Sequence, residues 1–179
     1  LLQRQVDGLI VSVTRESGPH LDVLRRAEVP VVYVNRNPVD LEGVRVVADH
    51  EDAVRQAVTH LVTLGHRRIG ILHGDLSYST GRGRLKGYEE ALADHGIPLD
   101  PAIIRSADFS AERAYEGTLA LLDGERPPTA LLATDIHSSM GIVRALQHRG
   151  VAVPGRMSVV GYDDHGWAEL LTPPLTVVA

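Results

Sequence analysis

The 179-residue chain is long enough to bury a sizeable core, either as one domain or as two small lobes. Its 18 basic and 23 acidic residues give a net charge of −5 without any run of basic residues, so this stretch makes a poor nucleic-acid surface. Disulfides and thiolate metal sites are excluded because there is no cysteine, and no apolar run approaches the ~20 residues that a membrane span needs.

The first third of the chain contains short apolar segments that are typical of strands buried on both faces. These predicted strands cover residues 9–13, 31–34 and 44–48. The polar segments 14–18 and 36–43 contain Gly or Pro and predict loops. Little helical pattern separates the second strand from the third, so we expect the chain to leave one lobe and enter another near Asp49.

The clearest predicted helix covers residues 50–64, where apolar side chains recur on one helical face. Asp49 suits the N-cap of this helix and Gly65 suits the position after its end. Further helices are predicted over residues 84–95, 111–122 and 136–149, and further strands over residues 69–73, 103–105, 130–133 and 158–161. This alternation predicts a doubly wound α/β fold with a parallel sheet.

Three glycines between positions 81 and 87 partly match a dinucleotide fingerprint. The loop before them is too long for the tight turn of that motif, so we expect no cofactor. Arg84 is instead predicted in the first turn of a helix at the carboxyl end of a strand, where its guanidinium could bind a diol, carboxylate or phosphate. A surface Arg84 paired with Glu89 or Asp108 fits the sequence equally well.

Polar residues also follow other predicted strands: Asn35, Asp163 and the pair Thr134-Asp135. Each can be explained locally as a helix cap or a turn. Their convergence at one edge of parallel sheets favours a ligand site, because α/β sheets bind ligands at the carboxyl ends of their strands. Phe109 is the only Phe and either packs in the core or provides an aromatic face beside Arg84 for a sugar ring.

Metal and hydrolytic sites are not favoured by the sequence. His60, His66 and His73 are spaced by six and seven residues and need not converge, so we expect no metal site. No Gly-x-Ser-x-Gly turn is present, and Ser138-Ser139 lie inside a predicted helix. The adjacent carboxylates Asp163-Asp164 would diverge at a strand end. An enzyme, such as a small α/β hydrolase, is therefore the least favoured interpretation of this sequence, and we expect no catalytic residues.

A series of short signals occurs in a fixed order from Val6 to Val177. They are Val6-Asp7-Gly8-Leu9-Ile10-Val11, Leu64-Gly65-His66-Arg67-Arg68-Ile69, the run from Arg84 to Tyr88, Pro127-Pro128-Thr129-Ala130, Ser158-Val159-Val160-Gly161-Tyr162-Asp163-Asp164 and Pro173-Pro174-Leu175-Thr176. In order and spacing this series resembles the effector-binding core of the lactose/galactose repressor (LacI/GalR) family of bacterial transcription regulators. The resemblance covers essentially the whole chain.

The resemblance implies a periplasmic-binding-protein-like type I fold, with two Rossmann-like lobes built on parallel sheets. Residues 1–48 would belong to the amino-terminal lobe and residues 49–179 to the carboxy-terminal lobe. In that family a small-molecule effector binds between the lobes and changes how a homodimer presents its DNA-binding helices. The helix-turn-helix that contacts operator DNA would precede this chain, and the family's last crossovers would follow it. We expect a cytoplasmic protein with no cofactor and no membrane association.

Matched position by position, the family's residues imply a pocket and a dimer interface in this chain. The pocket would be lined by Ser12, Asn35, Thr80, Arg84, Phe109, Thr134 and Asp163. The interface would include Ser139, Met140, Val143, Trp167 and Leu171.

The chain departs from the family pattern at two pocket positions, which affects the expected effector. Thr134 stands where members commonly have Asn, and Asn35 where they often have Asp. Both changes alter the pattern of donors and acceptors. We expect a sugar or sugar derivative as effector, with a nucleobase as the alternative. The alternative function is a solute-binding protein of a sugar transporter, which shares the fold.

Overall fold

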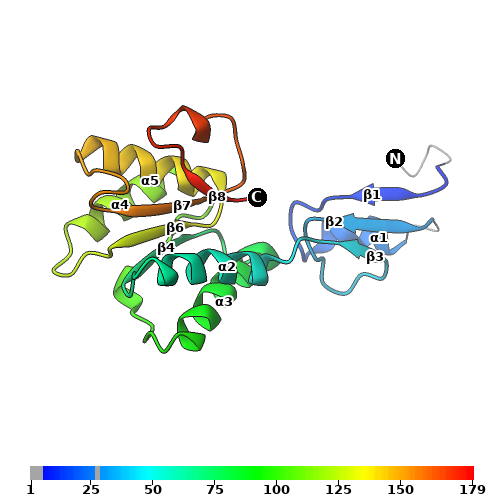
Figure 1. The fold of residues 1–179 in the computed structure, drawn as a ribbon. Helices are drawn as coiled ribbons and strands as arrows, with labels where there is room; N and C mark the ends of the chain where they lie inside the picture. Colours follow the sequence, from blue (N-terminus) through cyan, green and yellow to red (C-terminus); the bar gives the residue numbers. More distant parts are fainter. Residues whose placement is uncertain (1–5, 27–28) are drawn as a thin grey trace.

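The computed structural model describes residues 6–26 and 29–179, and it divides them between two parallel sheets (Figure 1). The first sheet has the order β1-β2-β3 and contains β1 (Leu9–Val11), β2 (Val31–Val34) and β3 (Val44–Val46). The second has the order β5-β4-β6-β7-β8 and contains β4 (Ile69–His73), β5 (Ile104–Ser106), β6 (Ala130–Ala133), β7 (Ser158–Tyr162) and β8 (Thr176–Val178).

The first lobe, residues 6–46, has a small core on one face of its sheet. The short helix α1 (Asp22–Arg25) follows a 3-10 turn, and Leu21 and Tyr33 are almost completely buried there. On the strands themselves, Ile10 is 79% exposed and Val44 is 64% exposed. In the part of the chain that the structure describes, this lobe therefore buries one face of its sheet and leaves apolar side chains on the other.

The second lobe has helices on both faces of its sheet (Figure 1). Helices α2 (His50–Thr63) and α3 (Ser79–Asp94) cover one face, and α4 (Ala111–Leu122) and α5 (Ile136–His148) cover the other. All residues of β4 and β6 are buried because both faces of these central strands are covered. The prediction of a doubly wound α/β fold with parallel sheets is confirmed.

Helix α3 begins at Ser79, five residues before the predicted start at position 84. Arg84 therefore lies in the second turn of the helix, and the expectation of a first-turn position was wrong. Glycine is a poor helix former, which is why Gly81 and Gly83 gave the appearance of a loop. A Cβ atom at Gly81 would overlap the backbone of Asp75, and one at Gly87 would overlap the backbone of Glu51. Close packing of the helix requires these glycines.

Other differences are confined to short elements. Strands β1 and β3 end at Val11 and Val46, two residues before their predicted ends at positions 13 and 48. Helix α1 and strand β8 were not predicted, because elements of three or four residues carry little periodic signal. The chain passes from β3 to α2 through residues 47–49, close to the expected boundary at Asp49. Within the described residues, no helix combines the length and apolar character that crossing a bilayer requires.

Candidate functional site

The strand order of the second sheet creates a crevice between β4 and β6. The chain winds to one side of β4 to form β5 and to the other side to form β6, so the connections diverge at the carboxyl ends of β4 and β6. Thr134 directly follows β6 at this edge of the sheet. Its hydroxyl donates to the Leu72 carbonyl at 3.3 Å and accepts the Gly74 N–H at 3.2 Å. The crevice is the place where a doubly wound sheet binds ligands.

Arg84 extends from α3 into this crevice and is only 8% exposed. Its Nη1 donates to the Thr134 carbonyl at 2.5 Å, and its guanidinium carbon lies 4.0 Å from the centre of the Tyr162 ring. Its Nε is buried without a hydrogen-bond partner. The alternative of a surface Arg84 is therefore wrong. The ring and the carbonyl hold the cation at the carboxyl ends of β6 and β7.

His50 and Tyr162 belong to the same cluster and were missed by the sequence interpretation. The Nδ1 atom of His50 lies 3.2 Å from the Tyr162 hydroxyl, and its Nε2 is buried without a partner. Burial, and secondly the positive charge of Arg84, lower the pKa of His50 to about 4, so the ring is neutral near pH 7. His50 begins α2 and looked like an ordinary helix-start residue, since its partner lies 112 positions away.

Three of the predicted pocket residues have left-handed backbone conformations. The φ angles are 67° at Asn35, 57° at Phe109 and 64° at Asp163. Asn and Asp tolerate this region, but a bulky residue such as Phe adopts it rarely. Strained residues cluster at binding sites, where the surrounding fold holds them in place. Asp40 and Asp108, outside the predicted pocket, also have positive φ, so among the pocket residues only the conformation of Phe109 supports a ligand site.

The exposure of the predicted pocket residues separates them into two groups. Ser12, Asn35 and Asp163 are exposed, and Phe109 is half-buried with its ring over Gly74. Thr80, Arg84 and Thr134 are buried, with Thr134 fully so. Thr134 was expected to line the pocket, but its hydroxyl and carbonyl are engaged within the protein. We conclude that Thr134 holds Arg84 in place through its carbonyl oxygen.

Asp135 and Ser139 have structural roles. The Asp135 carboxylate accepts the Ser138 N–H at 3.0 Å and the Ser138 hydroxyl at 2.6 Å, so it caps α5 as its local interpretation predicted. The Ser139 hydroxyl donates to the Asp135 carbonyl and accepts the Tyr162 N–H, both at 3.0 Å. Ser139 was expected at the dimer interface, but its side chain is 1% exposed and satisfied inside this chain. It therefore joins α5 to β7.

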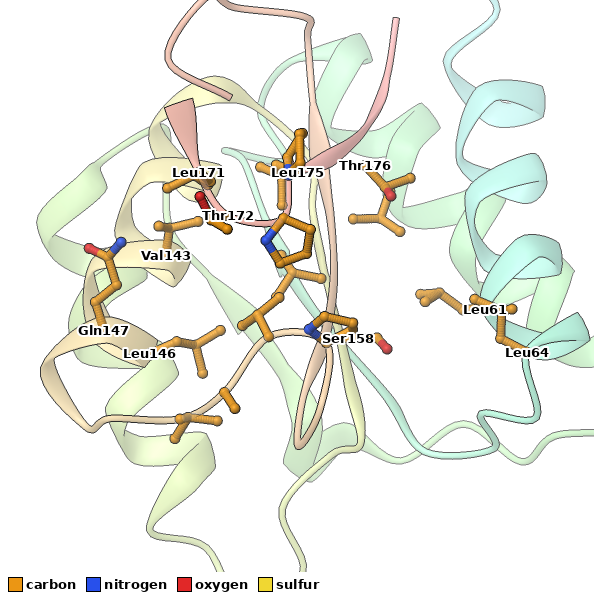
Figure 2. Close-up of a pocket in the computed structure, with 18 of the residues that line it drawn as sticks. Leu61, Leu64, Val143, Leu146, Gln147, Ser158, Leu171, Thr172, Leu175 and Thr176 are labelled. Atoms are coloured by element: carbon orange, nitrogen blue, oxygen red, sulfur yellow. The ribbon is translucent and has the colours of Figure 1, made fainter. Parts of the chain in front are cut away.

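The other expected interface residues lie nearer the surface, and two of them line a cavity. Met140 is 46% exposed, and Val143, Trp167 and Leu171 are half-buried. Val143 and Leu171 line one side of a cavity of 560 Å³, opposite Leu61 at the end of α2 (Figure 2).

This cavity is unsuited to a polar effector. None of the predicted pocket residues lines it, and most of its lining residues are Leu, Val, Ala or Pro. Ser158, one of its polar residues, already has its hydroxyl 2.9 Å from Nε2 of His66. The chemistry that could recognise a hydroxylated molecule lies instead at the carboxyl ends of the strands.

A second cavity lies between the lobes beside the crossover. It has a volume of 360 Å³ and is lined by Asn35 and Asn37 from the first lobe, by the crossover, and by His50, Ser79 and Gly83 from the second lobe. No group of three or more His, Asp or Glu residues able to hold a metal occurs within residues 6–26 and 29–179. Two parallel-sheet lobes with a cavity between them, lined by Asn35 among the predicted pocket residues, define the class of a periplasmic-binding-protein-like domain.

Comparison with known proteins gives the family. Residues 58–179 match the periplasmic binding protein-like domain family. Over 180 residues the chain is 33% identical to the HTH-type transcriptional repressor PurR of Haemophilus influenzae strain KW20, covering 99% of this chain and 53% of that protein. The chain thus spans about half the length of the curated relatives that it matches.

Two solved structures place the similarity more narrowly. A regulatory protein of the LacI family from Chloroflexus aggregans superimposes with a TM-score of 0.88 at 32% identity, over 96% of this chain and 62% of that one. The complex of the transcriptional regulator CelR with cellobiose gives 0.87 at 32% identity, over 98% and 54%. The chain belongs to the lactose/galactose repressor family, as its sequence signals predicted.

Proposed function

We propose that this chain is the effector-sensing core of a ligand-responsive bacterial transcription regulator, in the simplest case a repressor. The observation that carries the proposal is the cluster of Arg84, His50 and Tyr162 at the carboxyl ends of the strands. Two buried nitrogens of this cluster, Arg84 Nε and His50 Nε2, have no partner within the described residues. Buried polar groups without partners are rare in folded proteins and are expected where a ligand or water binds.

The proposed effector is a sugar or sugar derivative that binds between the lobes. Arg84 offers donors and Asp163 offers acceptors, a combination that suits a molecule rich in hydroxyls. Phe109 lies beside the crevice, 5.9 Å from the Tyr78 ring, and provides an apolar wall for a sugar ring. The similarity to a regulator solved with cellobiose supports this class. A flat nucleobase stacked on the aromatic rings is the alternative.

In the proposed mechanism the effector changes the angle between the lobes. A ligand shifts the balance of two conformations only through its differential affinity for them. Contacts from both lobes, such as Asn35 on one side and Arg84 on the other, would provide that difference. The full-length protein would act in the cytoplasm as a homodimer, transmitting the change to an operator-binding domain outside this chain. Met140, Val143, Trp167 and Leu171 are proposed as interface positions.

The alternative of a solute-binding protein shares the fold but lacks specific support. The relatives found by sequence are transcriptional repressors and regulators. We also propose no catalytic role, because the relatives found by sequence are transcriptional regulators.

A thermal-shift screen of the full-length protein against sugars, sugar phosphates and nucleobases tests the proposal. A ligand present at about 100 times its dissociation constant adds about 2.7 kcal/mol of stability, which raises the unfolding midpoint visibly. Any ligand found is then tested for its effect on operator binding by fluorescence anisotropy. The regulator proposal predicts that operator affinity changes with the ligand. A ligand that stabilises the protein but leaves operator affinity unchanged contradicts it.

A further inference from the structure

Glu16 is a buried carboxylate at the contact between the two lobes. It lies in the loop after β1 and is 4% exposed. Its oxygens accept the Ser79 N–H at 2.7 Å, the Asn37 N–H at 3.2 Å, the Arg82 Nη2 at 3.2 Å and the hydroxyl of Ser79. Every one of these neighbours is a donor, so the surroundings of Glu16 are those of an anion site.

The site coincides with the beginning of α3. The N-cap residue Tyr78 makes no side-chain capping bond, and the first turn of α3 contains no acidic residue. The free N–H groups of a helix start carry partial positive charge and favour an anion. In this protein the anion is supplied by the opposite lobe, because Glu16 reaches across to Ser79.

Other contacts between the lobes converge on the same few residues. The Asn37 N–H lies 3.3 Å from the Ser79 hydroxyl, and the Arg36 guanidinium lies 3.9 Å from the centre of the Tyr78 ring. Helix α3 also carries Thr80 and Arg84, two of the predicted effector-binding residues. The carboxylate of Glu16 therefore links the first lobe to the helix that positions Arg84.

We propose that Glu16, which accepts the N–H of the cavity-lining residue Ser79, determines the specificity of the cleft. It fills the anion position at the start of α3, so a phosphate or carboxylate group of an effector cannot take that position. The cleft accordingly selects an effector that is uncharged where it meets α3. This inference rests on the proposed function for the existence of an effector, but the occupancy of the anion position is a property of the free protein.

The cleft disfavours an anionic ligand because such a ligand would cost the protein the contacts that Glu16 makes. Two negative groups cannot share one set of donors, so the ligand would have to displace Glu16. Displacement would strand a carboxylate that is now satisfied by Ser79, Asn37 and Arg82, and it would break the link between the lobes. A neutral sugar leaves these contacts intact.

Hydrogen exchange on the full-length protein tests the link without any effector. The amides of Ser79 and Asn37 are expected to exchange slowly in the wild type and markedly faster in Glu16→Ala. The amides of α5, on the far face of the sheet, provide the internal control and should not change. Equal exchange at Ser79 in both proteins would overturn the proposed occupancy.

Binding of inorganic phosphate tests the selection itself, measured by calorimetry at fixed ionic strength. Glu16→Ser leaves the surrounding donors in place and opens the space, so its phosphate affinity should exceed that of the wild type by about tenfold or more. Glu16→Gln is the matched control, because it removes the charge but fills the space, and it should show no gain. Adding Arg82→Ala to Glu16→Ser should reduce the gain.

Each outcome decides the inference. Equal phosphate affinity of the wild type and Glu16→Ser overturns it. A folded Glu16→Ser whose Ser79 amide exchanges fast but whose phosphate affinity does not rise overturns it as well. If Glu16→Ser does not fold, exchange at Ser79 in Glu16→Gln decides whether the charge maintains the link. Failure of the sugar screen would remove the proposed function, but it would leave the exchange and phosphate results unaffected, so the two failures are distinguishable.

Discussion

The properties of single residues at the crevice depend on partners from distant parts of the chain. Arg84 is buried, yet its charge is compensated by a carbonyl from the end of β6 and by the ring of Tyr162 from the end of β7. The position of Arg84 and Asp163 near strand ends was predictable from the order of strands and helices. The contribution of Tyr162 was not, because an aromatic residue ending a buried strand is equally typical of a core.

Replacement of Arg84 is expected to reduce effector binding. Arg84→Ala removes a charge-assisted contact and should cost about 1.5–3 kcal/mol in binding free energy. Arg84→Lys keeps the charge but loses the planar fork and should bind with intermediate affinity. Calorimetry with a ligand from the screen measures both, and thermal unfolding checks that each variant is folded. Wild-type affinity in folded Arg84→Ala would remove Arg84 from the site.

The hydroxyl of Tyr88 is expected to contribute to stability alone. It is buried and donates to the Ile69 carbonyl at 2.7 Å, where burial raises its pKa. Tyr88→Phe should lower the free energy of unfolding by about 1 kcal/mol without changing effector affinity. Tyr115→Phe is the matched control, because its hydroxyl meets His148 at the surface. Denaturant unfolding measures both variants. An equal loss of unfolding free energy in the two would contradict the role given to burial.

At the scale of elements, glycines decide how closely the helices approach. Gly141 lies in α5 where it crosses α4, and a Cβ atom there would overlap the Ala111 carbonyl and the Ala114 side chain. Gly87 brings α3 equally close to the backbone of α2. Helix propensity disfavours glycine, so the sequence placed the start of α3 after Gly81 and Gly83, which was too late. The close approach of two helices became visible only in the assembled lobe.

Alanine substitutions at two helical glycines should therefore have different effects. Gly141→Ala forces α4 and α5 apart and is expected to destabilise the protein by about 1–3 kcal/mol. Gly117→Ala in α4 is the control, because its Cβ would make only ordinary contacts with Leu72 and Arg105. Its better helix propensity should leave stability unchanged or raise it by up to about 1 kcal/mol. Urea unfolding measures the stability of the two variants. A Gly117→Ala variant less stable than Gly141→Ala would contradict this explanation by helix packing.

At the scale of the whole molecule, the neutral His50 couples stability to pH. Its pKa in the folded protein is about 4, below the ordinary value of 6.5. As the pH falls below about 6.5, the unfolded chain binds a proton first, and the folded state loses stability until the pH reaches about 4. Burial lowers the pKa of His66 in the same direction. The full contribution of both residues is present above pH 6.5.

His50→Asn isolates the contribution of His50. Between pH 7.5 and pH 5 the wild type should lose about 1–2 kcal/mol more unfolding free energy than the variant, after allowance for partial exposure of the ring. Asparagine can keep a polar contact with Tyr162 but does not titrate. Denaturant unfolding at the two pH values measures the difference. Parallel pH dependence in the two proteins would show that His50 is not held neutral in the fold.

The sequence by itself determined the class of this protein. Buried strands alternate with amphipathic helices, and this local periodicity was sufficient to predict parallel sheets, helices on both faces and a polar edge at the strand ends. The order of short signals was sufficient to place the chain in its family. These features depend on neighbouring residues or on their order along the chain, so they can be recognised without knowing which segments meet in space.

The tertiary structure decided which polar groups meet and which are already satisfied. His50 and Tyr162 approach each other across 112 positions, and Glu16 reaches Ser79 across 63. Thr134 and Ser139 are polar residue types that are typical of binding sites and surfaces. Their hydroxyls are nevertheless hydrogen-bonded to backbone groups of the neighbouring strands. Satisfaction of a buried polar group is a property of the complete set of neighbours, and only the packed chain brings that set together.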